Sequence, residues 1–145
     1  GWITGADILL MTTNGGINWI FKSIVGGGLY GLKSVFFIDI NTGWAAGTFH
    51  YSQPHGTIVK TTDGGVTWER KLSFASGDLN SIHFVNENTG WAGGTFGNII
   101  KTTNGGVNWV RTKMNSVSAI NSIAKGIFQL DIQYFLVGSN ASRKV

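Results

Sequence analysis

The stretch 61-TTDGGVTW-68 occurs three times along the chain, with small changes between the copies. The other two copies are 12-TTNGGINW-19 and 102-TTNGGVNW-109, and the closing tryptophans lie 49 and 41 residues apart. Self-similarity at a period of about 20 to 50 residues is typical of repeat architectures, in which each repeat forms one supersecondary unit. The sequence therefore predicts a repeat protein.

Two further markers recur together with this motif. One is Gly-Trp, at positions 1–2, 43–44 and 90–91. The other is an apolar pattern that reads 32-LKSVFF-37, 79-LNSIHF-84 and, more weakly, 120-INSIAK-125. All six tryptophans of the chain fall on these markers, which indicates that tryptophan is a residue of the repeat: Trp2, Trp19, Trp44, Trp68, Trp91 and Trp109.

The best-preserved unit, 79–114, divides into four short extended segments. They are expected at 81–85, 90–95, 98–102 and 108–113, with 104-NGG-106 as the tight turn between the last two. Four strands in such a period are typical of one β-propeller blade. We therefore expect a single all-β propeller domain with units at approximately 1–31, 32–78 and 79–119 and a partial fourth at 120–145.

Three units and a fragment do not close a ring, because propellers have about four to eight blades. We expect the chain to be a segment of a longer propeller, and the alternative is that copies associate to close the ring between them. The second unit carries an insertion, 50-HYSQPH-55, which contains the only proline. We expect it to form an extended loop on one face.

The eight-residue motif has a structural explanation. Asp63 can accept hydrogen bonds from backbone N–H groups of its own turn, Gly65 allows a positive φ, and Trp68 offers a large ring to bury. Asn14 and Asn104 replace the aspartate in the other copies, which argues against a catalytic carboxylate. The residues expected to be structural are Thr12, Asn14, Gly16, Trp19, Thr61, Asp63, Gly65, Trp68, Thr102, Asn104, Gly106 and Trp109, with Trp2, Trp44 and Trp91 of the Gly-Trp marker.

This motif resembles the Asp-box, also called the bacterial neuraminidase repeat. The fuller pattern Leu-x-Ser-Val/Ile-x-Phe, Gly-Trp-Ala-x-Gly, Lys-Thr-Thr-Asp/Asn-Gly-Gly-x-x-Trp is similar to the repeat of photosystem II stability and assembly factors. The resemblance covers about residues 1–114 and implies a propeller fold. It also implies one of three functions: protein binding, as in the assembly factors; binding or scaffolding in secreted or cell-surface bacterial proteins; or catalysis, as in sialidases and some endoglucanases.

Candidate catalytic and metal-binding residues do not assemble into a site at the level of sequence. A sialidase needs three arginines around a carboxylate, whereas Arg70 and Arg111 occupy the same position in neighbouring repeats and are expected to form an arc. No pair of acids suggests glycosidase chemistry. His50 and His55 lack a third zinc ligand. We therefore expect no catalysis, metal or cofactor, while an enzyme whose catalytic residues lie in other blades remains the alternative.

The charged residues of the sequence predict a surface that is modestly basic. The formal net charge is +4, no Lys/Arg block indicates nucleic-acid binding, cysteine is absent, and no apolar run is long enough to span a bilayer. Basic residues recur at equivalent positions, either as solvated strand edges or as a shallow surface for an acidic protein segment or a polyanionic glycan. The candidate surface comprises Lys60, Arg70, Lys71, Lys101 and Arg111, with His50, Tyr51 and His55 of the insertion.

The function expected from the sequence is non-catalytic binding or scaffolding with a protein or glycan partner. The resemblance alone suggests an extracytoplasmic bacterial protein, either secreted or on the cell surface.

Overall fold

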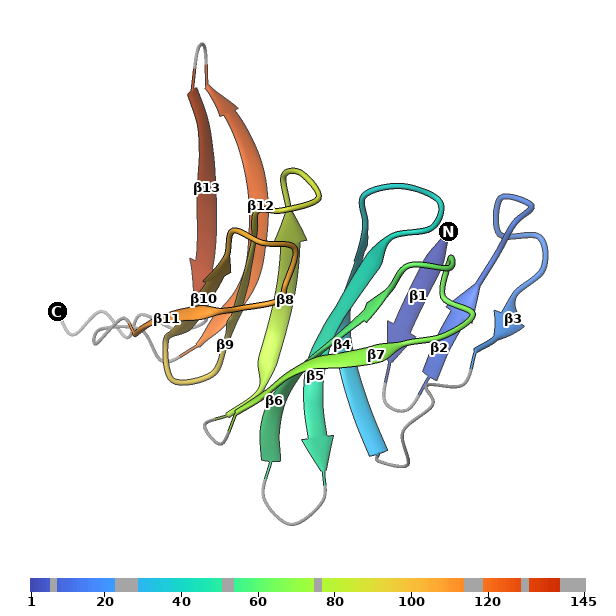
Figure 1. Cartoon of the computed structure of the whole chain (residues 1–145), viewed down its shortest axis with the longest axis horizontal. Coiled ribbons are helices and arrows are strands. Elements are labelled where there is room, and N and C mark those ends of the chain that lie inside the picture. Colours follow the sequence, from blue (N-terminus) through green and yellow to red (C-terminus); the bar gives the residue numbers. More distant parts are fainter. Residues whose placement is uncertain are drawn as a thin grey trace, which may run out of the picture.

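The computed structural model describes residues 1–5, 8–22, 29–50, 54–74, 77–113, 119–128 and 131–138. These residues form thirteen strands in four antiparallel sheets, and among them no helix has the length and apolar character to cross a membrane. Figure 1 shows the sheets following one another along the molecule, from β1–β3 at one end to β12–β13 at the other.

Each sheet contains strands that are consecutive in the sequence. The first has the order β1 (Trp2–Gly5), β2 (Ile8–Met11), β3 (Ile20–Phe21). The second is β4 (Leu29–Phe37), β5 (Gly43–His50), β6 (Pro54–Thr61), β7 (Glu69–Phe74). The third is β8 (Leu79–Phe84), β9 (Gly90–Gly94), β10 (Asn98–Thr102), β11 (Val110–Lys113), and the fourth is β12 (Ile120–Phe128), β13 (Asp131–Gly138).

The sheets pack on one another through equivalent strands. β4 contacts β8, and β8 contacts β12, so the strands that carry the Leu-x-Ser pattern form an inner row. β1 contacts β4 in the same way that β5 contacts β8 and β9 contacts β12. This is the arrangement of propeller blades around part of a ring, and the expected all-β propeller fold is confirmed.

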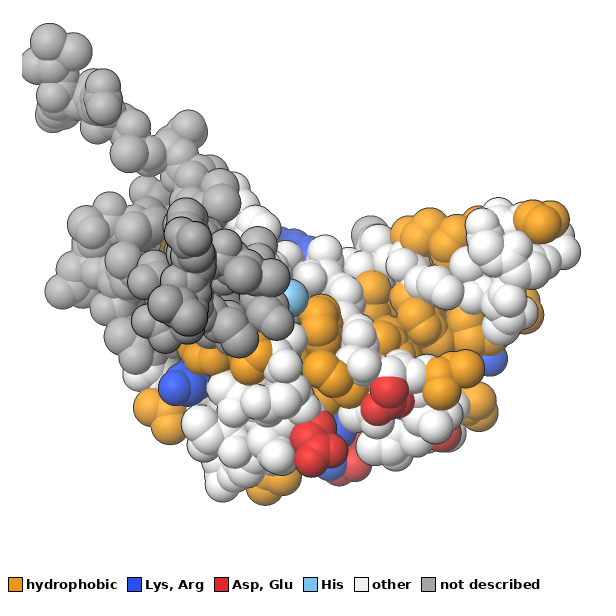
Figure 2. All heavy atoms as spheres, turned by 90° about the horizontal axis from the view of Figure 1, so that it is seen from above, with side chains coloured by type: hydrophobic (Ala, Val, Ile, Leu, Met, Phe, Trp, Pro, Cys, Tyr) orange, Lys and Arg blue, Asp and Glu red, His pale blue; other side chains and the backbone are white. Residues whose placement is uncertain are grey.

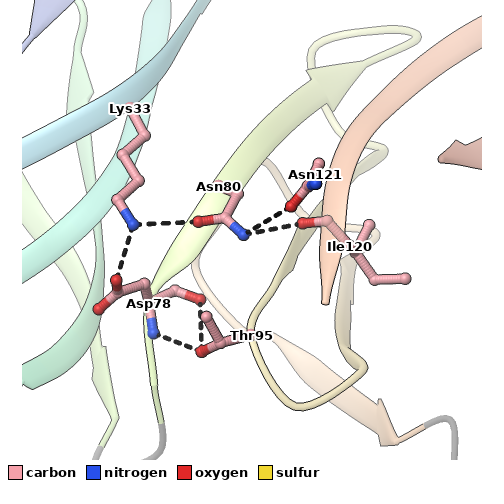
Figure 3. Close-up of polar contacts among 6 residues, drawn as sticks. All are labelled: Lys33, Asp78, Asn80, Thr95, Ile120 and Asn121. Carbon is pink, nitrogen blue, oxygen red and sulfur yellow. Dashed lines mark hydrogen bonds and ion pairs between the residues drawn. The ribbon is translucent and has the colours of Figure 1, made fainter. Parts of the chain in front are cut away.

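The inner strands are also joined by polar side chains, which Figure 3 shows. The ammonium of Lys33 on β4 donates to Asp78 at 2.7 Å and to the Asn80 Oδ1 of β8 at 3.1 Å. The Asn80 amide in turn donates to the Ile120 carbonyl of β12 at 3.0 Å and to Asn121 at 3.5 Å. The second position of the inner-strand pattern thus links the second sheet to the third and the third to the fourth.

Alternation along the strands divides the core between the sheets, because successive side chains of a strand point to opposite faces. On β5, Trp44 and Ala46 pack toward the third sheet with Phe84, while Ala45 packs toward the first sheet with Leu9. The second sheet is therefore covered on both faces, which matches its near-continuous apolar runs.

The expected loop at 50–55 is wrong in its extent. β5 and β6 continue through the insertion, with Phe49 opposite His55 and His50 opposite Pro54. The extra residues lengthen the hairpin because each added pair extends the same antiparallel ladder. Residues 51–53 lie outside the described part of the chain.

Candidate functional site

Each eight-residue motif forms a turn closed by its own side chains. In the second copy, Thr61 Oγ1 accepts the N–H of Gly65 at 2.8 Å and donates to Asp63 Oδ1 at 2.8 Å. Asp63 accepts the N–H of Thr67 at 2.9 Å and its hydroxyl at 2.5 Å. Gly64 and Gly65 have φ of +66° and +76°, values that favour glycine.

The other two copies make the same turn with an amide in place of the carboxylate. Asn14 Oδ1 accepts the N–H of Asn18 at 2.9 Å, and Asn104 Oδ1 accepts the N–H of Asn108 at 2.9 Å. The first threonine of each copy donates to this oxygen, at 2.9 Å in one and 3.1 Å in the other. The turn therefore requires an acceptor oxygen at this position, and it does not require a negative charge.

We predict that Asp63→Asn keeps the fold at neutral pH and removes one contribution to acid unfolding. Hydrogen bonds from Thr67 and then Thr61 lower the pKa of Asp63 from 3.8 to about 2. A carboxylate whose pKa is lower in the folded state contributes stability that is present above about pH 4 and is lost as the pH falls toward 2. Thermal midpoints measured from pH 5 to pH 2 should therefore fall less for Asp63→Asn than for the wild type.

The control for this prediction is Asp63→Ala, which leaves the N–H of Thr67 without its acceptor. This variant should have a lower midpoint than Asp63→Asn at pH 7. Equal midpoints for the two variants at pH 7 would contradict the role of the acceptor oxygen.

The Gly-Trp tryptophan of one sheet contacts the motif turn of the next sheet. Trp44 is fully buried, its Nε1 donates to the Gly105 carbonyl at 3.3 Å, and its ring stacks on Phe84 with centroids 3.7 Å apart. Trp2 repeats this arrangement one sheet earlier, stacked on Phe37 at 4.6 Å. The tryptophans therefore hold consecutive sheets together.

The tryptophans that close the motifs complete these aromatic groups. The ring of Trp68 meets Phe37 edge to face at 5.9 Å, and the ring of Trp109 meets Phe84 in the same way at 6.0 Å. Trp91, on β9 beside the fourth sheet, is half-buried, with the Lys101 ammonium 5.2 Å from its ring centroid.

Among the predicted basic surface residues, Lys60 and Lys71 come together. The Lys60 ammonium donates to the Gly105 carbonyl at 3.1 Å and lies 5.0 Å from the Trp44 ring centroid. Burial, followed by the charge of Lys71, lowers the pKa of Lys60. Both lysines line a pocket of about 390 Å³ whose other charged residue is Glu69, which pairs with Lys71 at 2.6 Å.

The two arginines do not converge. Arg70 lies over the Phe49 ring at 5.1 Å, while Arg111 donates from Nε to the buried Asn98 Oδ1 at 2.9 Å. They occupy equivalent strands, β7 and β11, of neighbouring sheets. His55 is half-buried on β6, whereas Tyr51 and the side chain of His50 lie outside the described residues.

Two of the described aspartates are held by protein groups. Asp39 accepts the N–H groups of Thr42 and Asn41 at 2.7 and 2.6 Å, which lowers its pKa, and Asp78 pairs with Lys33 of the neighbouring sheet. No group of three His, Cys, Asp or Glu side chains that could hold a metal ion occurs within the described ranges.

A second hollow lies between the first and second sheets. It measures about 590 Å³ and is lined by Trp2, Met11, Phe37 and Ile40, among others. Met11 occupies the position that Lys60 has in the second repeat, so this hollow carries no ammonium at that point. The Lys60 pocket differs from this hollow in having two lysine side chains in its lining.

Comparison with known proteins identifies relatives of this chain. The family profile of the photosynthesis system II assembly factor YCF48 matches residues 30–122. A solved structure described as "YCF48 bound to D1 peptide" matches with a TM-score of 0.68 and 22% sequence identity, over 96% of this chain and 44% of that chain. The chain thus spans less than half the length of that relative. No curated protein matches the sequence.

Proposed function

Because this chain belongs to the family of the photosynthesis system II assembly factor YCF48, we propose that it is a non-catalytic module that binds a segment of another protein. The relative was solved with a D1 peptide bound, which supports a peptide as the kind of ligand. We further propose that the bound segment is acidic and contacts the pocket formed by Lys60 and Lys71. A polyanionic glycan is the second candidate ligand, and an extracytoplasmic location remains a prediction from the resemblance.

The observation that carries this proposal is the state of Lys60. Its ammonium donates to the Gly105 carbonyl at 3.1 Å and lines the same pocket as Lys71. Partial burial and then the charge of Lys71 lower its pKa, and the charges of Glu69 and Glu87 oppose this shift only in part. An opposite charge within about 4–6 Å favours the charged form of such a group. A carboxylate of the ligand would therefore stabilise both lysines, and binding would raise the pKa of Lys60.

We predict that the double variant Lys60→Met, Lys71→Gln binds an acidic peptide about tenfold more weakly than the wild type. One exposed charge contact contributes up to about 1 kcal/mol, and the variant loses two such contacts, while a tenfold change in affinity corresponds to about 1.4 kcal/mol. The probe is a fluorescein-labelled ten-residue peptide of alternating Glu and Ser, and the measurement is fluorescence anisotropy at low ionic strength. Met at position 60 reproduces the first repeat, where Met11 stands, so the fold should be kept. Added salt should weaken wild-type binding.

The matched control is Lys22→Gln. Lys22 follows Trp19 by three residues, as Lys71 follows Trp68. The first repeat has Met11 at the position of Lys60, so Lys22 has no counterpart of Lys60 beside it. This variant should bind the peptide as the wild type does. Equal affinity of the double variant and the wild type would overturn the proposed site, and binding of heparin without binding of the peptide would assign the surface to a glycan.

A further inference from the structure

The hairpin turn between β9 and β10 holds a phenylalanine in a backbone conformation that favours glycine. Phe96 has a φ of +58° and Gly97 a φ of +65°, and the Asn98 N–H donates to the Thr95 carbonyl at 3.2 Å. Two-residue hairpin turns with positive φ at both central residues favour asparagine, aspartate or glycine, because a bulky side chain is strained there. Among the residues that the structure describes, Phe96 is the one residue other than glycine with a positive φ.

Packing within the chain does not explain this phenylalanine. Phe96 is 61% exposed. Part of its ring lies against Gly77, where an added Cβ would come within 2.9 Å of the Phe96 Cδ2. The rest of the ring faces solvent. A residue that is both strained and largely exposed indicates a function outside the fold, because neither property stabilises the folded chain.

The second sheet has a phenylalanine at the same position, and an arginine lies over its ring. The segments 43-GWAAGTF-49 and 90-GWAGGTF-96 differ at one residue, so Phe49 is the counterpart of Phe96. The Arg70 guanidinium lies 5.1 Å from the centroid of the Phe49 ring. This is a cation–π contact, in which the face of the ring attracts a positive charge. The second sheet therefore shows which kind of group a ring at this position accepts.

The length of the hairpin separates ring and arginine in the third sheet. β5 and β6 remain paired beyond Phe49, whereas the chain of the third sheet already turns at Phe96. Arg111, the counterpart of Arg70, donates from Nε to the Asn98 Oδ1 at 2.9 Å. Within the described part of the chain, no cation lies over the Phe96 ring. This ring is therefore an aromatic surface of the same kind, but without a cation from its own sheet.

An acidic residue adjoins the turn. Asp78 follows Gly77, and its N–H donates to the Thr95 Oγ1 at 2.8 Å (Figure 3), while the Thr95 N–H donates to the Asp78 carbonyl at 3.0 Å. The Asp78 carboxylate pairs with Lys33, and 27% of the Asp78 side chain remains exposed. A carboxylate beside an exposed ring makes this surface complementary to a cation.

This turn lies at the opposite end of the sheets from the Lys60 pocket. The motif turns lie beside the connection between β8 and β9, since the Gly105 N–H donates to the Asn88 carbonyl at 2.8 Å. Figure 2 views the molecule from that end, where acidic side chains in red lie beside basic ones in blue. Phe96 follows the other end of β9, so the two surfaces are separate and can be tested independently.

We propose that the Phe96 ring is a docking point for an arginine side chain of a partner protein. The guanidinium stacks on the ring, as that of Arg70 lies over Phe49, and it donates to the Asp78 carboxylate. Arginine suits both contacts because its guanidinium is planar, stacks on aromatic rings and donates in a fixed fork. The strained turn presents the ring at the tip of the hairpin, where a partner reaches it. This contact is additional to the proposed binding at Lys60 and does not depend on it.

The first part of the test is the stability of the variant Phe96→Asn. Asparagine tolerates a positive φ, so this variant relieves the turn and removes the ring. Its thermal midpoint should equal that of the wild type or exceed it by up to about 3 °C. A midpoint several degrees below that of the wild type would overturn the proposal, because the phenylalanine would then serve the fold.

The second part is binding of the peptide acetyl-Gly-Arg-Gly-amide to the whole chain, followed by NMR with isotope-labelled phenylalanine. The Phe96 ring signals are those that Phe96→Asn removes. We expect them to shift saturably, while the signals of the Phe49 ring, which Arg70 covers, stay in place. A peptide with leucine instead of arginine should bind at least about threefold more weakly, as expected for the loss of one exposed cation–π contact.

The control is the double variant Lys60→Met, Lys71→Gln, which should bind the arginine peptide as the wild type does. Failure of the proposed Lys60 pocket would therefore leave this test unaffected. Absence of a shift at Phe96 with the arginine peptide would overturn the proposal. Equal or tighter binding of the leucine peptide would also overturn it, because the ring would then accept an apolar side chain.

Discussion

Gly94→Ala is expected to destabilise the protein by about 3 kcal/mol or more, the largest effect that we predict for a single methyl group. The new Cβ would lie 1.8 Å from the carbonyl oxygen of Asp78 and 2.9 Å from the Cα of Leu79. Both are backbone atoms of the adjoining strand, at the point where the register between β8 and β9 shifts, so no side-chain rotation relieves the overlap. Urea unfolding followed by circular dichroism measures the loss.

Gly5→Ala is the matched control for this substitution, because Gly5 holds the same position in the first repeat. With no described atom within 4 Å of its Cβ, alanine there should be neutral or slightly stabilising, since it restricts the unfolded chain. A similar loss of stability in both variants would show that the strand needs glycine for its own conformation. A loss confined to Gly94→Ala would show that the neighbouring strand imposes it.

Trp44→Ala is expected to lower the free energy of unfolding by about 3–5 kcal/mol. The side chain is fully buried, stacks on Phe84 and donates to the Gly105 carbonyl, so its removal leaves a cavity between the second and third sheets. A natural domain has about 5–15 kcal/mol in total, so this one residue accounts for a large share. Chemical denaturation followed by circular dichroism tests this prediction.

The control is Trp19→Ala, which removes the tryptophan that closes the eight-residue motif of the first repeat. Trp19 is 40% exposed, and its loss should lower the free energy of unfolding by only about 1–2 kcal/mol. Where Trp44→Ala does not fold, Trp44→Phe should fold and lose about 1 kcal/mol, because it keeps the stacked ring and removes the hydrogen bond. Equal losses for Trp44→Ala and Trp19→Ala would contradict the role of packing between sheets.

Much of the fold could be predicted from the sequence because the decisive interactions are local. The turn at 61–68 closes through hydrogen bonds that span four residues, such as those from Gly65 to Thr61 and from Thr67 to Asp63. The alternation of side chains along a strand also predicts from 79-LNSIHF-84 that Ile82 and Phe84 share one face, and both are buried. The same patterns carry the resemblance to propeller repeats.

The candidate site was only partly predictable. The recurrence of lysine marked Lys60 and Lys71, but the sequence does not show that Lys60 reaches the Gly105 carbonyl, 45 residues further along the chain. It also does not distinguish Lys60 from Lys101, since each lysine directly precedes the Thr-Thr of its motif. The glycines of the Gly-Trp strands recur in the sequence, but the sequence does not show why glycine is needed there. At Gly47 and Gly94 the backbone of the adjoining strand leaves no room for a Cβ.

The sequence by itself determined the repeat, the turns and the alternation of the strands, because these depend on residues within one unit. Tertiary structure alone decided which face of each tryptophan is covered, where an ammonium is held, and which glycine has an inner strand beside it. The physical reason is that these properties arise where one sheet packs on the next. Gly5, Gly47 and Gly94 are the same residue in the same pattern, and only the neighbouring backbone makes them different.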